Sequence, residues 1–316
     1  MTRVAAIDCG TNSIRLLIAD VIDGQLTDVV RELQIVRLGQ DVDRTGRLAA
    51  GALERTRLAL ADYAESIRTH GAERVRMVAT SATRDAENRA DFVEMVQGEL
   101  GVEPEVISGH DEAALSFAGA VSVLPADPGV LLVADIGGGS TELVRGGDGP
   151  IRAHSMNVGC VRLTERHLHD DPPTPTQIEA VVADVETAIV VARSDVRLEA
   201  GVPFVGVAGT VTTVVGIALG LPAYDSAVIH GARITAAQIE DVVDRLSRMT
   251  RAERAALPVM HPGRVDVVVG GALVLRTLVR QIGVHEVVAS EHDILDGIAL
   301  AAASEREAAH AVSRRR

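Results

Sequence analysis

Near its middle the chain reads Val133-Ala134-Asp135-Ile136-Gly137-Gly138-Gly139-Ser140-Thr141-Glu142-Leu143-Val144. The apolar run from Val130 to Ala134 predicts a buried strand that ends on an acid, and a second short strand begins after the glycines and hydroxyl residues. Consecutive glycines let a backbone turn sharply and direct several N–H groups at one point, because no Cβ is in the way. Such a concavity binds anions, phosphate above all. An ordinary glycine hairpin is the alternative interpretation, although such a hairpin needs no acid.

Acids flank this glycine turn. Asp135 stands at its entrance and Glu142 beyond it, so the two are predicted to hold a hard cation beside a bound phosphate. The glycines do not have the G-x-G-x-x-G spacing of a dinucleotide fingerprint, and a strand follows them instead of a helix. The pattern therefore favours a phosphate and metal site over a dinucleotide site.

The same design opens the chain, at Ala6-Ile7-Asp8-Cys9-Gly10-Thr11-Asn12-Ser13. When the two copies are aligned, the matching pairs are Asp8 with Asp135, Gly10 with Gly137, and Ser13 with Ser140. Both copies follow an apolar strand and lead into another one. The repeat predicts an internally duplicated protein with one turn in each half and a single ligand held from both sides.

Composition excludes several classes of function. The chain has 316 residues, of which 47% are hydrophobic and 24% charged, as in a globular protein large enough for two domains. All 31 basic residues are arginine, which excludes a Walker A loop and a Schiff-base lysine. A net charge of −13 and an aromatic content of 2% argue against binding to nucleic acid or to anionic membrane.

Two further observations concern the location of the protein. No apolar run approaches the roughly 20 residues that a membrane span requires. The two cysteines, Cys9 and Cys160, are too few for a disulfide framework and predict reduced thiols in a cytoplasm.

The order of the expected elements is that of a mixed α/β fold. In the first half, the strands 4–8, 14–21, 26–38, 75–79 and 105–108 and the helices 52–70, 85–100 and 111–123 are expected. The segment Pro125-Ala126-Asp127-Pro128-Gly129 predicts a domain boundary, which gives domains 1–125 and 126–316. The last helix, over about 293–310, falls in the second range, with the alternative that it packs back on the first domain.

Several residues outside the glycine turns are candidates for chemistry. Gly109-His110-Asp111-Glu112 places two acids at the start of a helix, where the helix dipole favours acids without any functional reason. This helix directly precedes the domain boundary, so it is also placed to supply a general base for water. Arg15 and Arg84 follow strand ends and are either surface arginines or phosphate contacts. Gly209-Thr210 opens a helix after a strand and offers N–H groups to an anion.

The combined pattern resembles the exopolyphosphatase/guanosine pentaphosphate phosphohydrolase (Ppx/GppA) family within the sugar kinase/Hsp70/actin superfamily. The matching segments, in chain order, are 6–13, 79–84, 107–113, 135–142, 158–165, 206–210 and 290–291. The resemblance implies two ribonuclease H-like (actin-like ATPase) domains of α/β class, with mixed sheets covered by helices and a cleft between them. Glu112 would lie near the end of the first domain.

The resemblance also implies a role for each matched position. Glu112 matches the catalytic carboxylate, which activates the water that attacks the terminal phosphate. Asp135 and Glu142 match acids near a divalent metal, with Mg²⁺ expected, Mn²⁺ as a substitute, and a monovalent cation such as K⁺ as a further candidate. The implied phosphate contacts are Asn12, Ser13, Arg84, Gly137, Gly138, Gly139, Ser140, Gly209 and Thr210.

The expected function is metal-dependent hydrolysis that releases terminal orthophosphate from inorganic polyphosphate, by a cytoplasmic homodimer with no nucleic-acid or membrane partner. Longer family members carry an additional helical domain after these two, so a preference for short polyphosphate chains is expected here. The first alternative is hydrolysis of the 5′ terminal phosphate of guanosine pentaphosphate. The others are a nucleotide-dependent kinase or ATPase, with Gly270-Gly271 in its adenosine pocket, and a non-catalytic sensor of polyphosphate or an alarmone.

Overall fold

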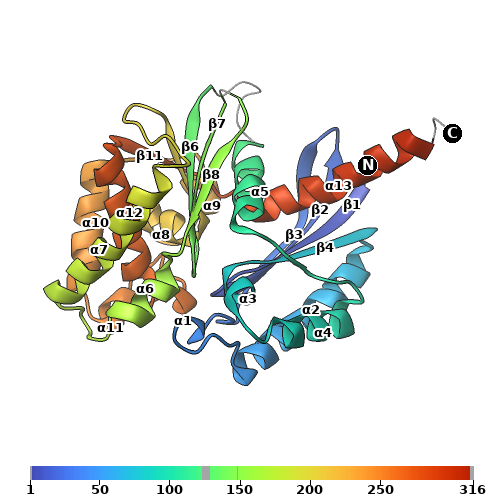
Figure 1. The fold of residues 1–316 in the computed structure, drawn as a ribbon, viewed down its shortest axis with the longest axis horizontal. Coiled ribbons are helices and arrows are strands. Elements are labelled where there is room, and N and C mark those ends of the chain that lie inside the picture. Colours follow the sequence, from blue (N-terminus) through green and yellow to red (C-terminus); the bar gives the residue numbers. More distant parts are fainter. Residues whose placement is uncertain (1, 123–128, 148, 314–316) are drawn as a thin grey trace. The chain divides into compact units, whose positions relative to one another are not determined.

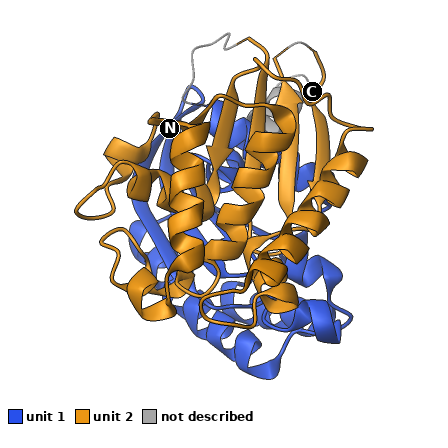
Figure 2. Cartoon of the chain, turned by 90° about the vertical axis from the view of Figure 1, so that its left-hand side faces the viewer, with its two compact units in different colours: residues 1–123, 292–316 blue, residues 124–291 orange. Residues whose placement is uncertain are grey.

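The computed structural model describes residues 2–122, 129–147 and 149–313, which fall into two compact units. Unit 1 comprises residues 1–123 and 292–316, and unit 2 comprises residues 124–291 (Figure 2). The predicted boundary between residues 125 and 126 lies outside the described residues. The final segment, which the predicted ranges placed in the second domain, groups with unit 1.

Unit 1 is built on a five-stranded sheet in the order β3-β2-β1-β4-β5 (Figure 1). Its elements are β1 (Thr2–Cys9), β2 (Ser13–Ile22), β3 (Gln25–Ile35), α1 (Val42–Thr45), α2 (Ala50–His70), β4 (Arg74–Ala79), α3 (Ser81–Asp85), α4 (Arg89–Leu100), β5 (Glu105–Val106), α5 (Gly109–Val121) and α13 (Ile294–Ser313). β1 pairs antiparallel with β2 and parallel with β4.

Helices cover both faces of this sheet. Successive residues of a strand point to opposite faces, so alternate residues of β1 pack against different helices. On β1, Ala5 and Ile7 belong to a buried cluster with residues of α2 and α4. Val4 and Ala6 belong to a second cluster with residues of α13. Asp8 therefore faces the same side as Val4 and Ala6, toward the layer that contains α13.

Helices α5 and α13 contact each other backbone to backbone. A Cβ added at Gly119 of α5 would lie 1.7 Å from the carbonyl oxygen of Asp293, and one added at Gly297 of α13 would lie 2.0 Å from that of Leu115. Only glycine permits these approaches, since real Cβ atoms do not come within 3.0 Å of such atoms. The position of α13 therefore helps to fix the position of α5, the helix that carries Glu112.

Unit 2 contains a six-stranded sheet in the order β10-β11-β9-β6-β7-β8. Its elements are β6 (Leu131–Ile136), β7 (Thr141–Gly146), β8 (Arg152–Met156), α6 (Cys160–His167), α7 (Pro175–Ala192), β9 (Phe204–Val207), α8 (Ala208–Ala218), α9 (Ser226–Ile229), β10 (Arg233–Thr235), α10 (Ala236–Arg248), α11 (Arg251–Ala255), a 3₁₀ turn (Pro262–Arg264), α12 (Val268–Ile282) and β11 (Glu286–Ala289). Thr235 caps α10 and forms a capping box with Gln238, which satisfies backbone groups at the start of this helix.

The core of unit 2 lies on one face of its sheet. Leu132, Ala134 and Ile136 of β6 share one buried cluster with residues of α7, α10 and α12. Since alternate residues face opposite sides, Asp135 lies on the other face of the sheet. None of the described helices is long and apolar enough to cross a membrane.

The two sheets share a topology, which confirms the predicted duplication. The order β3-β2-β1-β4 in unit 1 corresponds to β8-β7-β6-β9 in unit 2. In both, the first strand of the unit runs antiparallel to the second and parallel to the strand on its other side. Each glycine turn joins the first strand of its unit to the second.

One predicted helix was wrong in extent. Residues 85–100 were expected to form one helix, but α3 ends at Asp85 and α4 begins at Arg89. Ala86 is extended between them, and the side chain of Asn88 exchanges hydrogen bonds with the backbone of Leu48 at 2.8 and 3.2 Å. These hydrogen bonds to a loop that is distant in sequence stabilise the break between α3 and α4. No local sequence pattern indicates them.

Candidate active site

The two glycine turns have the same internal geometry. Gly10 N donates to Ser13 O at 3.0 Å, and Gly137 N donates to Ser140 O at 3.0 Å. The turns therefore match in hydrogen bonding as well as in sequence. The sequence alignment of the two copies is confirmed at this position.

In unit 2 the carbonyls of the glycine turn are held by the first turn of α6. Cys160 N donates to Gly137 O at 2.9 Å, and Val161 N donates to Gly138 O at 2.8 Å. The side chain of Arg162 donates from Nε to Gly139 O at 2.7 Å. With their oxygens engaged by α6, the glycine peptides present their N–H groups elsewhere.

These N–H groups are the candidate anion-binding part of the turn. Within the part of the chain that the structure describes, the amides of Gly138 and Gly139 donate to no backbone carbonyl. Ser140 follows them and is buried. Successive unpaired amides beside a hydroxyl make a concavity suited to phosphate oxygens.

The two acids of this turn lie side by side. Asp135 on β6 is paired in register with Glu142 on β7, so both side chains are on the same face of the sheet. Both are buried, with exposed fractions of 7% and 1%. Two buried like charges favour a cation next to them, and oxygen ligands are those that Mg²⁺ takes. No group of three or more possible ligands occurs among the described residues, but Mg²⁺ commonly uses one or two carboxylates together with water and substrate phosphate.

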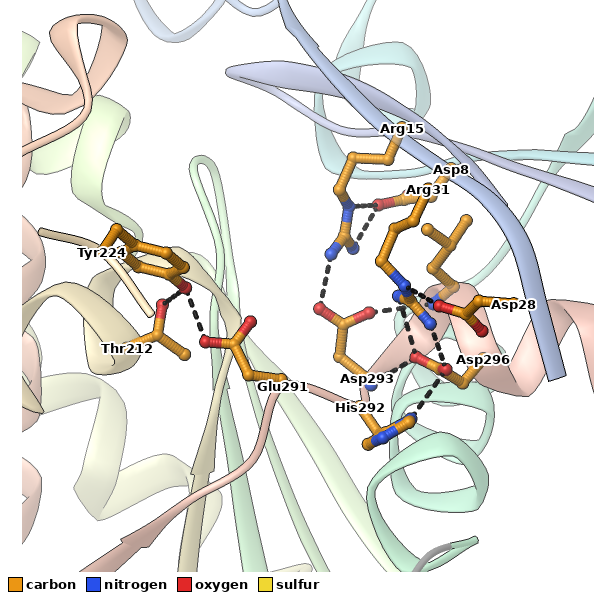
Figure 3. Close-up of polar contacts among 11 residues, drawn as sticks. Asp8, Arg15, Asp28, Arg31, Thr212, Tyr224, Glu291, His292, Asp293 and Asp296 are labelled. Atoms are coloured by element: carbon orange, nitrogen blue, oxygen red, sulfur yellow. Dashed lines mark hydrogen bonds and ion pairs between the residues drawn. The ribbon is translucent and has the colours of Figure 1, made fainter. Parts of the chain in front are cut away.

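The equivalent position in unit 1 carries the opposite charge. Asp8 is paired in register with Arg15, and its Oδ2 accepts from Arg15 Nε and Nη2 at 3.0 and 2.6 Å. Arg15 Nη1 also donates to Asp293 at the start of α13 (Figure 3). The acid of the glycine turn in unit 1 is therefore paired with an arginine, whereas the acid in unit 2 lies beside a second acid. Arg15, which was a candidate phosphate contact, is held between two carboxylates.

A second ion cluster fixes the start of α13. Arg31 Nη2 of β3 donates to Asp296 Oδ1 at 2.6 Å, and His292 Nδ1 lies 2.9 Å from the same oxygen (Figure 3). Burial raises the pKa of Asp296, but its bonds to His292 and Arg31 outweigh burial and lower that pKa to about 2. Both ends of this cluster lie in unit 1.

Glu112 sits in the first turn of α5, and it is buried. Ser108 caps this helix by accepting a hydrogen bond from Asp111 N. Glu112 has an exposed fraction of 7%, and its Oε2 accepts from Arg84 Nη1 at 2.9 Å. Burial raises the pKa of the Glu112 carboxyl to about 7, although Arg84 acts in the opposite direction. A carboxylate with a pKa near neutrality is suited to accept a proton at physiological pH.

The remaining candidates are divided between the units. Asn12, Ser13 and Arg84 lie in unit 1, and Gly209 and Thr210 lie in unit 2. Arg84 is in α3 and is positioned by its bonds to Glu112 and to Ile107 O. Gly209 and Thr210 open α8, as predicted.

An arginine that no local sequence pattern indicated, Arg264 of the 3₁₀ turn, lies against the start of α8. Arg264 lies against Gly209, since a Cβ added there would be 2.3 Å from its guanidinium carbon. Arg264 Nη1 donates to Thr213 Oγ1 at 3.1 Å, and none of the described carboxylates forms an ion pair with it. A cation at a helix N-terminus is unfavourable on its own and favourable when an anion binds there. No local pattern links Arg264 to Gly209, because they are far apart in sequence.

Two other features surround α8. Ala208 has a φ of 68°, which is strained for a residue with a Cβ and is typical of functional sites. The Tyr224 hydroxyl lies 2.9 Å from Thr212 Oγ1 and 2.6 Å from Glu291 Oε1 (Figure 3). The second turn of α8 is thus held by hydrogen bonds to the side chains of Thr212 and Thr213.

The space next to Gly270 and Gly271 is filled by neighbouring atoms, so these glycines do not line an open pocket. A Cβ at Gly271 would lie 2.4 Å from Thr210 Oγ1, and one at Gly270 would lie 2.7 Å from Thr164 Oγ1. Their small size lets α12 approach Thr210 and α6. The suggestion that they contribute to an adenosine pocket therefore has no support from this packing.

The chain is similar to known proteins in both sequence and fold. Residues 17–304 match the Ppx/GppA phosphatase family. The chain is 52% identical to Exopolyphosphatase 2 of Mycobacterium tuberculosis, over 96% of this chain and 99% of that protein. It is also 49% identical to an exopolyphosphatase-like protein of known crystal structure, with a TM-score of 0.92 over 95% of this chain and 97% of that one. The Ppx/GppA family member of Aquifex aeolicus is 30% identical, with a TM-score of 0.81 over 96% of this chain and 98% of that one. These matches confirm the predicted α/β fold.

Proposed function

Because this chain belongs to the Ppx/GppA phosphatase family, as its matching segments predicted, we propose that it is an exopolyphosphatase, a hydrolase that releases orthophosphate from the end of inorganic polyphosphate. The observation that carries the proposal is Glu112, a buried carboxylate whose pKa is raised to about 7. A hydrolase needs such a group to accept a proton from water. The glycine turn of unit 2 supplies the amides for phosphate.

Each group has a defined task in the proposed reaction. Glu112 orients a water molecule and takes one of its protons as the water oxygen forms a bond to the terminal phosphorus. The bond from that phosphorus to the bridging oxygen breaks, and the shortened chain leaves with the bond's electron pair. The amides of Gly138 and Gly139 orient the terminal phosphate, and Arg264 neutralises part of the substrate's charge. Positioning and charge stabilisation dominate such phosphoryl transfer.

The donor set of Asp135 and Glu142 fits Mg²⁺, since both are hard oxygen ligands on one face of the sheet. When bound, Mg²⁺ offsets the charge of the phosphates and of the transition state. Asp8 of unit 1 does not fit a cation in the same way, because Arg15 already occupies its carboxylate with a positive charge. We therefore assign the metal to the carboxylates of unit 2.

The setting that we propose is a cytoplasmic homodimer. Cys9 and Cys160 are both free and buried, which suits a reducing compartment. Burial raises the pKa of the Cys160 thiol to about 11, so this thiol is held in its unreactive protonated form. Size-exclusion chromatography with light scattering tests the dimer.

One assay tests the proposed activity. Orthophosphate release is measured in parallel from polyphosphates of several defined lengths, from guanosine pentaphosphate and from ATP, with and without Mg²⁺. Turnover of polyphosphate at the highest kcat/KM supports the proposal, and the length series also tests the expected preference for short chains. Preferred turnover of guanosine pentaphosphate would replace it with the first alternative. Tight binding of polyphosphate without turnover of any substrate would identify a sensor.

The rate is expected to depend on pH through Glu112. Its pKa is raised by burial, and only the deprotonated carboxylate can accept a proton from water. The value of kcat should therefore fall about tenfold per unit as the pH drops below about 7, and it should level off above that. The pH profile of kcat at saturating polyphosphate and Mg²⁺ measures this. The same inflection in the residual activity of the Glu112→Gln variant would show that another group causes it.

Removing one carboxylate is expected to weaken the binding of Mg²⁺. Asp135→Asn keeps the shape of the side chain but removes its charge, and ligand charge sets cation affinity. The Mg²⁺ concentration for half-maximal activity should rise at least about tenfold, since even the outer partners of metal ligands are worth about 10–100-fold in affinity. Titration of activity with Mg²⁺ checks this. An unchanged Mg²⁺ requirement would remove Asp135 from the metal site.

A further inference from the structure

Three side chains of unit 2 form a row across three neighbouring strands. Asp135 of β6 is paired in register with Glu142 of β7, and Glu142 is paired in register with Ser155 of β8. Paired residues of adjacent strands lie on the same face of a sheet. Ser155 Oγ donates a hydrogen bond to Glu142 Oε1 at 2.7 Å.

Glu142 needs such a partner for a physical reason. Its exposed fraction is 1%, and it lies beside the second buried carboxylate, Asp135. A glutamate side chain has several rotamers, and repulsion from a neighbouring carboxylate favours those that point away from it. A hydrogen bond to one oxygen selects a single orientation before any cation arrives, so that binding does not have to order the side chain.

We propose that Ser155 is a positioning residue for the metal site, which holds the Glu142 carboxylate in its metal-binding orientation through the bond to Oε1. Ser155 touches neither substrate nor cation in this role. It acts through Glu142, as the hydrogen-bonding partners of metal ligands commonly do. The inference rests on the proposed metal site of Asp135 and Glu142.

The duplicated half of the chain provides an internal comparison. The three equivalent positions in unit 1 are Asp8, Arg15 and Leu33, which are paired in register in the same way. There the middle position is an arginine that binds Asp8 directly and is held by Asp293. The third position is the apolar Leu33, which offers no hydroxyl donor. A hydroxyl thus occurs in the row that holds two acids and not in the row that holds an ion pair.

Binding of Mn²⁺ tests the proposal without relying on turnover. Free Mn²⁺ is measured by electron paramagnetic resonance in titrations of the full chain, with orthophosphate present because phosphate oxygens complete sites of this kind. Ser155→Ala is expected to bind Mn²⁺ about 10–100-fold more weakly than the wild type. Ser155→Thr, which keeps the hydroxyl, is expected to retain most of the affinity. Thr187→Ala is the matched control, since it removes an exposed hydroxyl that bonds only within α7.

Kinetics separate positioning from a general structural defect. The Ser155→Ala variant should require more Mg²⁺ for half-maximal activity but approach the wild-type kcat at saturating Mg²⁺. A variant that is merely misfolded would instead lose kcat and melt at a lower temperature. Ser155→Cys, similar in size but a poor hydrogen-bond donor, keeps the test available if the alanine variant does not fold, and it should bind Mn²⁺ as weakly as alanine does.

The outcomes are distinct. Wild-type Mn²⁺ affinity in both Ser155→Ala and Ser155→Cys would overturn the positioning role and leave the metal site itself in place. If the wild type binds no Mn²⁺, or if Glu142→Gln binds it normally, the metal site of the proposed function is wrong, and the inference falls with it.

Discussion

Turnover of polyphosphate by a Glu112→Gln variant is expected to fall by about 10²–10⁴-fold, the usual value of general-base catalysis. Glutamine has the shape of glutamate but cannot take a proton from water. Its amide oxygen can still accept the hydrogen bond that Arg84 Nη1 now donates to Oε2 at 2.9 Å, so no buried donor is left unpaired. Binding of polyphosphate should therefore be retained, which calorimetry measures directly because the variant is slow.

The neighbouring acid provides the control for this variant. Asp111 lies one residue earlier on α5, is exposed, and bonds to Ser108 within the helix cap. Asp111→Asn is expected to have near wild-type kcat. The Glu112→Gln variant should not lose thermal stability at pH 8, since a charged carboxylate is unfavourable in a buried site. Near-normal kcat in Glu112→Gln, or the large loss in Asp111→Asn instead, would remove Glu112 from the role of base.

The glycine turns could be predicted because their signal is local. A strand, an acid, glycines and a hydroxyl residue follow one another within about ten residues, and the backbone conformations that they allow are few. The duplication could be predicted for the same reason, because each copy of the pattern is local. The two copies, aligned at Ser13 and Ser140, also place Arg15 opposite Glu142, so the charge difference between the units was present in the sequence. The consequence of this difference, the ion pair between Asp8 and Arg15, depends on the register of β1 with β2.

Contacts between distant parts of the chain could not be predicted. Asp293 at the start of α13 holds Arg15 of β2, and Arg264 lies against Gly209 at the start of α8. Each contact depends on how helices and strands pack against one another. A sequence pattern indicates only the local structure of neighbouring residues. The raised pKa of Glu112 could not be predicted for the same reason. Two acids at a helix start indicate a favourable dipole whether or not they are buried, and burial is what raises the pKa.

Replacing Gly159 with alanine is expected to disrupt the glycine turn of unit 2. A Cβ at Gly159 would lie 2.5 Å from Gly138 O and 2.7 Å from the carbonyl carbon of Gly139. These are backbone atoms, so the turn itself has to move. A displacement of about 1 Å at a phosphate-positioning group can cost on the order of 10²-fold in rate. We therefore expect kcat/KM for polyphosphate to fall by about 10²-fold, as measured by initial rates of orthophosphate release.

Stability separates the effect of Gly159 on the turn from a general effect of losing glycine. Forcing a methyl group into this packed site should also lower the free energy of unfolding by about 1–3 kcal/mol, which denaturant titration measures. Gly98 is the matched control, because it lies within α4 and a Cβ added there meets no atom within 4 Å. Gly98→Ala should leave kcat/KM unchanged and stabilise the protein by about 0.5–1 kcal/mol, since alanine is favoured over glycine inside a helix. A Gly159→Ala variant with wild-type kcat/KM would show that the amides of this turn do not position the reacting phosphate.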